Sequence, residues 1–388
     1  MMIRRVSAQA VFCILAGGIM LSAIALPAVE PNSGDWFYNP FNRDSAHHRP
    51  IGTGARYAAD SHPATQDWLM KGQFNITPGS GPWGCGIWES APEDPLFTVA
   101  YASPRNEGDP GEFPVACRLP LSMVKKTYAV AEQFDGVLVV YDRASETIHQ
   151  FRQFNWNSPE ATLESRPTAS SHKTWDLKGP GHGAKLGDRI GTSASGVAAM
   201  FGILRGWEVR KTGHPIGHAL QMTLPRKPEN NCMMLGREVW WPAVSMDGGA
   251  YKIASNNTGH IPYGSLWALP PVEKGGPDLA ALGLSEKALR LAECIRDYRI
   301  YIVDGGGQPT LRADQDFDAE LLRELRESSA KYYRYIRLVE NSVPDNGKVK
   351  YKAGDAPAAP SGGEHRQILP GEFPAGGGTP LAPNTAIR

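Results

Sequence analysis

Asp142 and Asp304 each stand at the end of an apolar run that predicts a strand. A glycoside hydrolase needs two carboxylates, one as an acid and the other as a base or nucleophile. Aspartate also favours the turns that follow strands for purely structural reasons. The sequence therefore makes Asp142 and Asp304 catalytic candidates and leaves the structural interpretation open.

Histidine and tyrosine supply a second set of acid–base candidates. His218 opens an apolar stretch, and His260 and Tyr263 lie three residues apart in a predicted loop. An imidazole exchanges a proton near neutral pH. A His–Tyr pair suits a lyase, in which one group removes the proton beside a uronate carboxylate and the other protonates the leaving oxygen. The alternatives are a half-buried histidine bonded to a carbonyl at 218, and an ordinary turn with an aromatic anchor at 260–263.

Arginine and tryptophan are the candidates for substrate binding. Arg143 and Arg189 could clamp an acidic sugar through two hydrogen bonds each, and surface ion pairs are the alternative. Flat aromatic rings stack on sugars, and many tryptophans here lie among Gly, Pro and Asn. Those expected to contact substrate are Trp156, Trp175, Trp241 and Trp267. Core packing is the alternative for each of them.

No cofactor or metal is expected. Residues 314–318 resemble the start of a calcium loop, but Ala319 replaces its glycine and Leu325 stands where its glutamate belongs. His47 and His48 have no acidic or cysteine partner in register. Acidic residues at the start of a helix explain the first pattern.

The composition excludes some classes of protein. The chain has 388 residues with 40 Lys+Arg and 40 Asp+Glu, so its formal net charge is zero. A nucleic-acid-binding protein would need a dense basic surface, and we expect no nucleic-acid partner. With 41% hydrophobic and 21% charged residues, the chain is globular rather than disordered.

Residues 1–28 are typical of a secretory signal. Arg4 and Arg5 precede an apolar run over 11–21, and Ala23 and Ala25 provide small residues for cleavage. A membrane anchor is the alternative, but the run is short for a span. We therefore expect a secreted or periplasmic bacterial protein without a membrane span after signal removal.

The mature chain would keep four cysteines, Cys85, Cys117, Cys232 and Cys294. An even number in an oxidising compartment predicts disulfides, and four cysteines allow three pairings. A Cys85–Cys117 bond is preferred because its loop is shorter.

The remaining pattern predicts a mainly β fold. The 42 glycines and 32 prolines favour many short strands, and helices do not alternate with strands as a parallel α/β fold requires. We expect a β-sandwich (jelly-roll-like) with a few short peripheral helices, built from a single β-rich domain over 29–342. The clearest strands are 137–141, 219–224 and 298–303, with 147–156 as a hairpin partner of the first, and helices are expected at 193–204, from Ser285 and over 318–335. A Pro/Gly-rich tail over 343–388 is expected to be disordered.

Several islands between residues 135 and 305 resemble a family of uncharacterised secreted bacterial proteins. The islands are Val139–Arg143, Trp175–Leu177, Gly191–Ala198, Ile216–Leu220, Trp241–Ala243, Ile261–Gly264 and Val303–Gly306. The sequence departs from the family pattern at Ser195, where the family usually has Asp, and at Ser245, where it has His. Because no activity is established for that family, the resemblance implies secretion and a shared fold and supplies no mechanism.

Together these features predict a carbohydrate-active enzyme that cleaves a polysaccharide or oligosaccharide, either a glycoside hydrolase or a polysaccharide lyase. The alternative is a non-catalytic glycan-binding or cell-envelope structural protein. The sequence leaves the substrate, the bond cleaved and the oligomeric state open.

Overall fold

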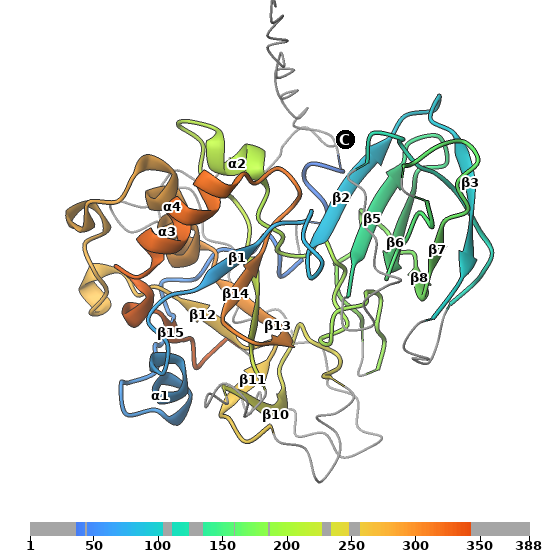
Figure 1. Cartoon of the computed structure of the whole chain (residues 1–388). Coiled ribbons are helices and arrows are strands. Elements are labelled where there is room, and N and C mark those ends of the chain that lie inside the picture. Colours follow the sequence, from blue (N-terminus) through green and yellow to red (C-terminus); the bar gives the residue numbers. More distant parts are fainter. Residues whose placement is uncertain are drawn as a thin grey trace, which may run out of the picture. The chain divides into compact units, whose positions relative to one another are not determined.

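The computed structural model describes residues 36–42, 45–103, 111–123, 135–158, 160–184, 187–226, 234–247 and 257–342 (Figure 1). These residues all fall within one unit, 32–388. The expected signal segment, the expected tail over 343–388 and Cys232 lie outside the described residues.

A six-stranded sheet forms the centre of the described chain. Its order is β1 (Asn75–Thr77), β14 (Thr310–Arg312), β9 (Leu220–Pro225), β13 (Ile300–Gly306), β12 (Leu266–Ala268) and β15 (Arg337–Leu338). The central pair, β9 and β13, is parallel, whereas β14 runs antiparallel to β9. In β9, Leu220 and Met222 point into one core, whereas in β13 Tyr301 and Val303 point into another. The sheet is therefore covered on both faces.

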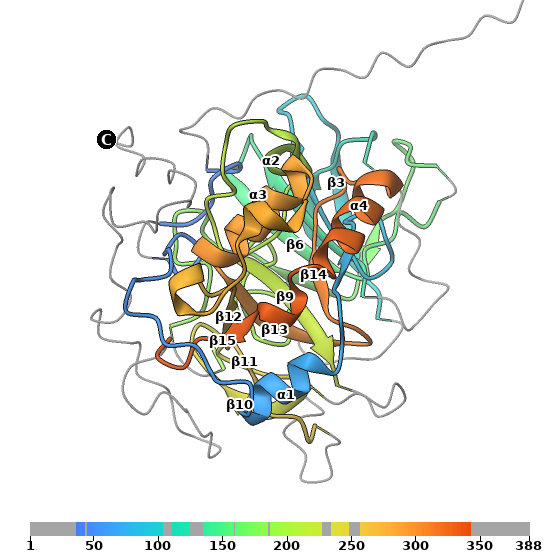
Figure 2. The same ribbon diagram turned by 90° about the vertical axis from the view of Figure 1, so that its left-hand side faces the viewer.

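Helices cover the first face of this sheet (Figure 2). They are α1 (Pro63–Leu69), α2 (Gly206–Arg210), α3 (Glu286–Asp297) and α4 (Ala319–Ser329), with short 3-10 turns η2 (Val272–Lys274), η3 (Leu279–Leu282) and η4 (Tyr333–Tyr335). Helix α3 begins where expected, because Ser285 Oγ accepts a hydrogen bond from Ala288 N at 3.2 Å.

Two further sheets stack beyond the second face. The four-stranded sheet has the order β2 (Cys85–Ser90), β5 (Val137–Asp142), β6 (Thr147–Arg152) and β8 (Ser171–Lys173). The three-stranded sheet contains β4 (Val115–Arg118), β3 (Leu96–Tyr101) and β7 (Thr168–Ala169), and β10 (Leu235–Val239) pairs separately with β11 (Ile261–Tyr263). Strand β5 alternates between two cores: Val139 faces the six-stranded sheet and Val140 faces the three-stranded sheet.

The mainly β composition with few short helices is confirmed, and so are several elements. The strand at 137–141 is β5, and β6 pairs with it antiparallel as its hairpin partner. The predicted helix at 193–204 is wrong, since this segment consists of turns in which Gly196 and Gly202 have positive φ angles. The last helix ends at Ser329, well short of residue 335. The sheets mix parallel and antiparallel pairs, as β2–β5 and β5–β6 illustrate.

The preferred Cys85–Cys117 disulfide is wrong. The described cysteines, Cys85, Cys117 and Cys294, are buried and are not joined in disulfides. Cys85 begins β2 and packs in the core beside the six-stranded sheet, whereas Cys117 lies in β4 within the core of the three-stranded sheet. The two residues are buried in different cores, and for that reason the short loop between them was a poor guide to a disulfide.

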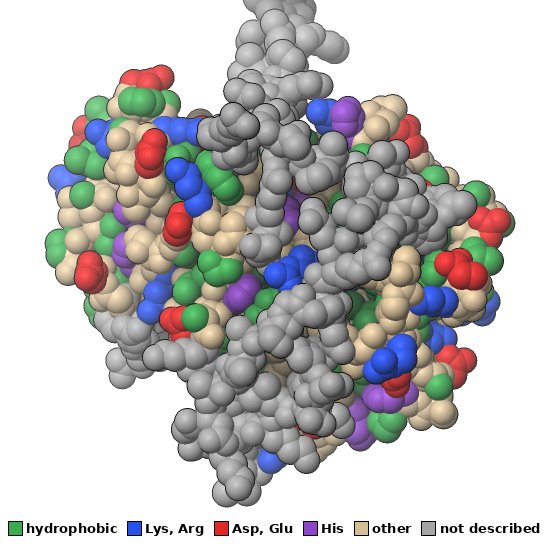
Figure 3. All heavy atoms as spheres, turned by 180° about the vertical axis from the view of Figure 1, so that it is seen from behind, with side chains coloured by type: hydrophobic (Ala, Val, Ile, Leu, Met, Phe, Trp, Pro, Cys, Tyr) green, Lys and Arg blue, Asp and Glu red, His purple; other side chains and the backbone are tan. Residues whose placement is uncertain are grey.

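Within the described part of the chain, no helix is long and apolar enough to cross a membrane. Acidic and basic side chains are interspersed over the face in Figure 3.

Candidate active site between two sheets

Asp304 lies near the end of β13, just after a register shift against β9. Its Oδ2 accepts hydrogen bonds from Arg312 Nη2 at 2.9 Å and from Ala194 N at 3.2 Å, and its Oδ1 accepts one from Gly305 N at 2.9 Å. Burial raises the pKa of Asp304, Arg312 opposes that shift, and the negative charges of Asp135 and Asp247 add to it. Asp304 is thus a carboxyl group that keeps its proton to a higher pH than an ordinary aspartate.

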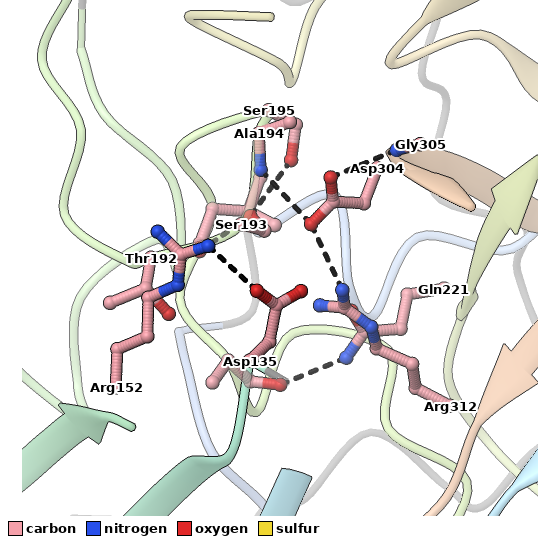
Figure 4. A network of polar contacts seen from close by, with 12 residues as sticks. Asp135, Arg152, Thr192, Ser193, Ala194, Ser195, Gln221, Asp304, Gly305 and Arg312 are labelled. Carbon is pink, nitrogen blue, oxygen red and sulfur yellow. Dashed lines mark hydrogen bonds and ion pairs between the residues drawn. The ribbon is translucent and has the colours of Figure 1, made fainter. Parts of the chain in front are cut away.

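Asp135 approaches Asp304 from the neighbouring sheet. It precedes β5, and its Oδ1 accepts a hydrogen bond from Nη2 of Arg152, the last residue of β6, at 2.7 Å. The carboxylates of Asp135 and Asp304 point into the same space between Arg152 and Arg312 (Figure 4). The site therefore lies where the four-stranded and six-stranded sheets meet.

A second ion pair adjoins Asp304. Arg226 follows β9, and its Nη1 lies 2.7 Å from Asp247 Oδ1. Arg226 crosses the end of β13 so closely that a Cβ on Gly305 would lie 2.2 Å from Arg226 Cδ. A glycine at 305 is what allows this arginine to lie against the strand.

Tyr263 and two serines complete the surroundings. Tyr263 is fully buried, and burial together with the charges of Asp304 and Asp247 raises the pKa of its hydroxyl, so it remains a hydrogen-bond donor at neutral pH. Ser193 Oγ lies 3.1 Å from Ser195 Oγ, and Ser195 N donates to Val303 O at 2.9 Å. Ser195 therefore places a neutral hydroxyl close to the end of β13 that carries Asp304. Ser245 Oγ donates to Met246 O at 3.3 Å.

The structure does not bring Asp142 to this site. Strand β5 begins just after Asp135 and ends at Asp142, and its ends lie roughly 16 Å apart at ~3.3 Å per residue. Glycosidase carboxylates are separated by about 5 to 9.5 Å. Asp142 is buried and instead pairs with Arg118 Nη1 at 3.3 Å, while its Oδ1 accepts a hydrogen bond from Ala144 N. Asp142 therefore stabilises a strand end and a turn.

His218 also lies elsewhere. It lies two residues before β9, whereas Asp304 pairs with Thr223 near the end of that strand, five residues and roughly 16 Å from His218 at ~3.3 Å per residue. The Nε2 of His218 contacts Glu208 Oε2 at 3.0 Å, and the ring stacks on His47 at 4.5 Å. Burial opposes the charge of His218, but Glu208 outweighs it and raises the pKa.

The two members of the expected His–Tyr pair separate. Tyr263 points into the core near Asp304, whereas the side chain of His260 is 57% exposed and contacts Asp67 Oδ2 at 2.9 Å. Of the five catalytic candidates, only Asp304 and Tyr263 come together.

The candidate binding arginines differ in position. Arg143 forms an ion pair with Glu89 and lies over the ring of Tyr141. Arg189 donates from Nη2 to Ser193 O at 3.0 Å, so it borders the Asp304 site.

Most of the candidate tryptophans belong to the interior. Trp156 and Trp267 are fully buried, and Trp267 stacks on Trp68 at 4.5 Å. Trp175 is 9% exposed and its indole N–H donates to Gln150 Oε1. Trp241 is half-buried beside His182 and is the only one of the four with substantial exposure. Trp241 is therefore accessible enough to stack on a sugar, whereas Trp156 and Trp267 are not.

Sequence reasoning missed Asp135, Arg152, Arg226, Asp247 and Arg312. One pair was within reach of the sequence, because Leu138 pairs with Phe151 in the predicted hairpin and this register places Asp135 near Arg152. The others meet through contacts between distant strands, which no local pattern reveals.

No group of three or more His, Cys, Asp or Glu side chains in the described ranges is arranged to hold a metal ion. Compared with known proteins, the chain matches no family model, no curated protein and no solved structure. The site must therefore be interpreted from its own chemistry.

Proposed function

We propose that this chain is a secreted or periplasmic carbohydrate-active enzyme that hydrolyses a polysaccharide at Asp304. The observation that carries the proposal is the approach of Asp135 to Asp304 between two sheets, where one carboxyl group has a raised pKa and the other is paired with Arg152. Two carboxyl groups in different environments are what glycoside hydrolysis requires.

In this proposal Asp304 is the acid and Asp135 is the second carboxylate. Protonated Asp304 gives its proton to the glycosidic oxygen as the bond from that oxygen to the anomeric carbon breaks. Asp135 either takes a proton from the attacking water or bonds to the anomeric carbon before water releases the sugar. Arg152 Nη2 lies 2.7 Å from Asp135 Oδ1 and holds this carboxylate in place for the role.

Hydrolysis has more support than elimination. The lyase mechanism relied on His260 acting with Tyr263, and their side chains lie apart, one exposed and one buried. Tyr263 fits better as a neighbour of Asp304.

The expected β-sandwich scaffold and the export signal belong to the same proposal. The scaffold is supported by the core between the four-stranded and three-stranded sheets, to which Val140 of β5 and Val99 of β3 both belong. Export rests on the pattern of residues 1–28.

A non-catalytic glycan-binding protein is the second candidate. The observation that favours it is that each aspartate of the site already has an arginine partner, as in a network that only stabilises the fold: Asp304–Arg312, Asp135–Arg152 and Asp247–Arg226.

A screen of the purified protein against neutral and acidic polysaccharides tests the proposal. New reducing ends without the ultraviolet absorbance of an unsaturated uronate support hydrolysis. Both signals together would indicate a lyase and contradict the proposed mechanism. Retention on a glycan column without any cleavage would favour the binding protein.

A further inference from the structure

Three arginines belong to the site of Asp304, each paired with one of its aspartates, and acid–base chemistry does not by itself require all of them. Arg152 comes from the end of β6, Arg226 follows β9, and Arg312 ends β14. Arg312 holds Asp304 and Arg152 holds Asp135, so both proposed catalytic carboxyl groups have their own partner. Arg226 forms its ion pair with Asp247, a third aspartate of the site.

Arg226 is held in place more firmly than a surface arginine needs to be. Its side chain lies across the backbone of Gly305, where a Cβ would come within 2.2 Å of Cδ and 2.9 Å of Nε. Asp247 fixes its guanidinium at 2.7 Å. A side chain that is packed against a strand end and anchored by a carboxylate has lost most of its rotamer freedom before any ligand arrives.

Arg226 also remains accessible, since 27% of its side chain is exposed, whereas Arg312 is only 11% exposed. The planar guanidinium offers five N–H donors in a fork that matches a carboxylate. The site thus presents one oriented, reachable guanidinium whose side chain lies against Gly305, the residue that follows the proposed acid.

The charges of the site also favour an anion. The three arginines are paired one to one with three aspartates, so the proton that Asp304 must carry to act as the acid leaves one positive charge unbalanced. The site then has a net positive charge, which a ligand carboxylate would neutralise.

We propose that the site selects glycans that carry a carboxylate on the sugar, as uronic acids do, and that Arg226 binds this carboxylate while Asp247 positions Arg226. This inference rests on the proposed function, because it names the substrate class of the same site. Arg226 takes the role that Arg143 and Arg189 were expected to share.

The test compares each acidic polysaccharide with its own carboxyl-reduced form, in which the chain and linkages are the same and the charge is gone. The full chain is expected to cleave the acidic form with a kcat/KM at least about tenfold higher. Arg226→Met is expected to lower kcat/KM for the acidic form by about 10- to 100-fold, mostly through KM, and to affect the reduced form much less. Arg226→Lys, which keeps the charge and loses the fork, should fall between the two.

Arg323→Met is the matched control, because Arg323 is exposed on α4, outside the proposed site, and pairs with Glu327 one turn away. Thermal melting of each variant shows whether it is folded. Equal cleavage of both forms would overturn the inference and leave hydrolysis at Asp304 standing. If no polymer is cleaved, affinity electrophoresis on the same pairs of polysaccharides is the deciding measurement. Stronger retention of the protein by the acidic form, lost in Arg226→Met, would support the inference without the hydrolase. Equal retention by both forms would overturn it.

Discussion

Arg312 Nη2 lies 2.9 Å from Asp304 Oδ2, and this ion pair joins the ends of two strands of the six-stranded sheet. Burial raises the pKa of the Asp304 carboxyl group, while the guanidinium limits the rise. The pKa of the proposed acid therefore depends on two opposing influences, burial and the charge of Arg312, and each can be changed separately.

Removing Arg312 should change the pH dependence of catalysis. In Arg312→Met the pKa of Asp304 rises further, because a neighbouring positive charge that lowers it is lost. Since the acid must be protonated to act, the alkaline limb of the kcat/KM profile should move to higher pH. A profile that stays in place, or moves to lower pH, would show that Asp304 is not the titrating acid.

The roles of Asp135 and Asp247 should differ. Asp135→Asn removes the second carboxylate and is expected to lower kcat by about 10²-fold or more on every substrate. Asp247→Asn loosens Arg226 and removes one of the charges that raise the pKa of Asp304, so it should raise KM for acidic glycans and lower kcat much less than Asp135→Asn does. The reverse pattern in steady-state kinetics would assign the second carboxylate to Asp247.

Trp267 should matter for stability and not for substrate binding. It is fully buried and stacks on Trp68, so Trp267→Ala is expected to lower the free energy of unfolding by about 3 to 5 kcal/mol. Trp83 is 47% exposed, and Trp83→Ala should cost far less. Urea unfolding of both variants checks this, and similar losses for the two would argue against the packing described.

Two buried histidines should make opposite contributions to the pH dependence of stability. Burial lowers the pKa of His172 to about 4, so the unfolded chain takes up a proton below pH 6.5 that the folded chain does not. His172 therefore destabilises the fold as the pH falls from 6.5 towards 4, by on the order of 1 kcal/mol at pH 5. His218 has a raised pKa, so its contribution is fully present below pH 6.5 and is lost as the pH rises through its folded pKa.

Urea unfolding at pH 5 and pH 8.5 tests both signs with His172→Gln and His218→Gln. The stability advantage of the unmodified chain over His218→Gln should be larger at pH 5. Its advantage over His172→Gln should be smaller at pH 5. The same sign for both variants would contradict the environments described.

The local elements were largely predictable from the sequence. Apolar runs closed by turn residues identified β5, β9 and β13, and the Ser285 cap identified the start of α3. The segment 193–204 misled because small apolar residues suit a helix, whereas its backbone instead bonds to β13 through Ser195 N.

The site was predictable only in part. Asp304 was recognisable because it ends an apolar strand, and Asp142 had the same local signature. Their tertiary contacts distinguish them. Asp304 approaches Asp135, which precedes a strand of another sheet, whereas Asp142 pairs with Arg118 of β4 in the three-stranded sheet. Burial of Trp156 and Trp267 likewise depends on which cores form, and flanking turn residues do not reveal it.

The most direct test of the central claim compares Asp304→Asn with Asp142→Asn on a polysaccharide that the unmodified protein cleaves. Both aspartates end predicted strands, and only Asp304 lies in the proposed site. Release of reducing ends should fall by about 10²- to 10⁴-fold in Asp304→Asn, with its circular dichroism unchanged. Asp142→Asn should keep its turnover and melt at a lower temperature, because it leaves Arg118 without its partner. Full turnover by folded Asp304→Asn would contradict the account.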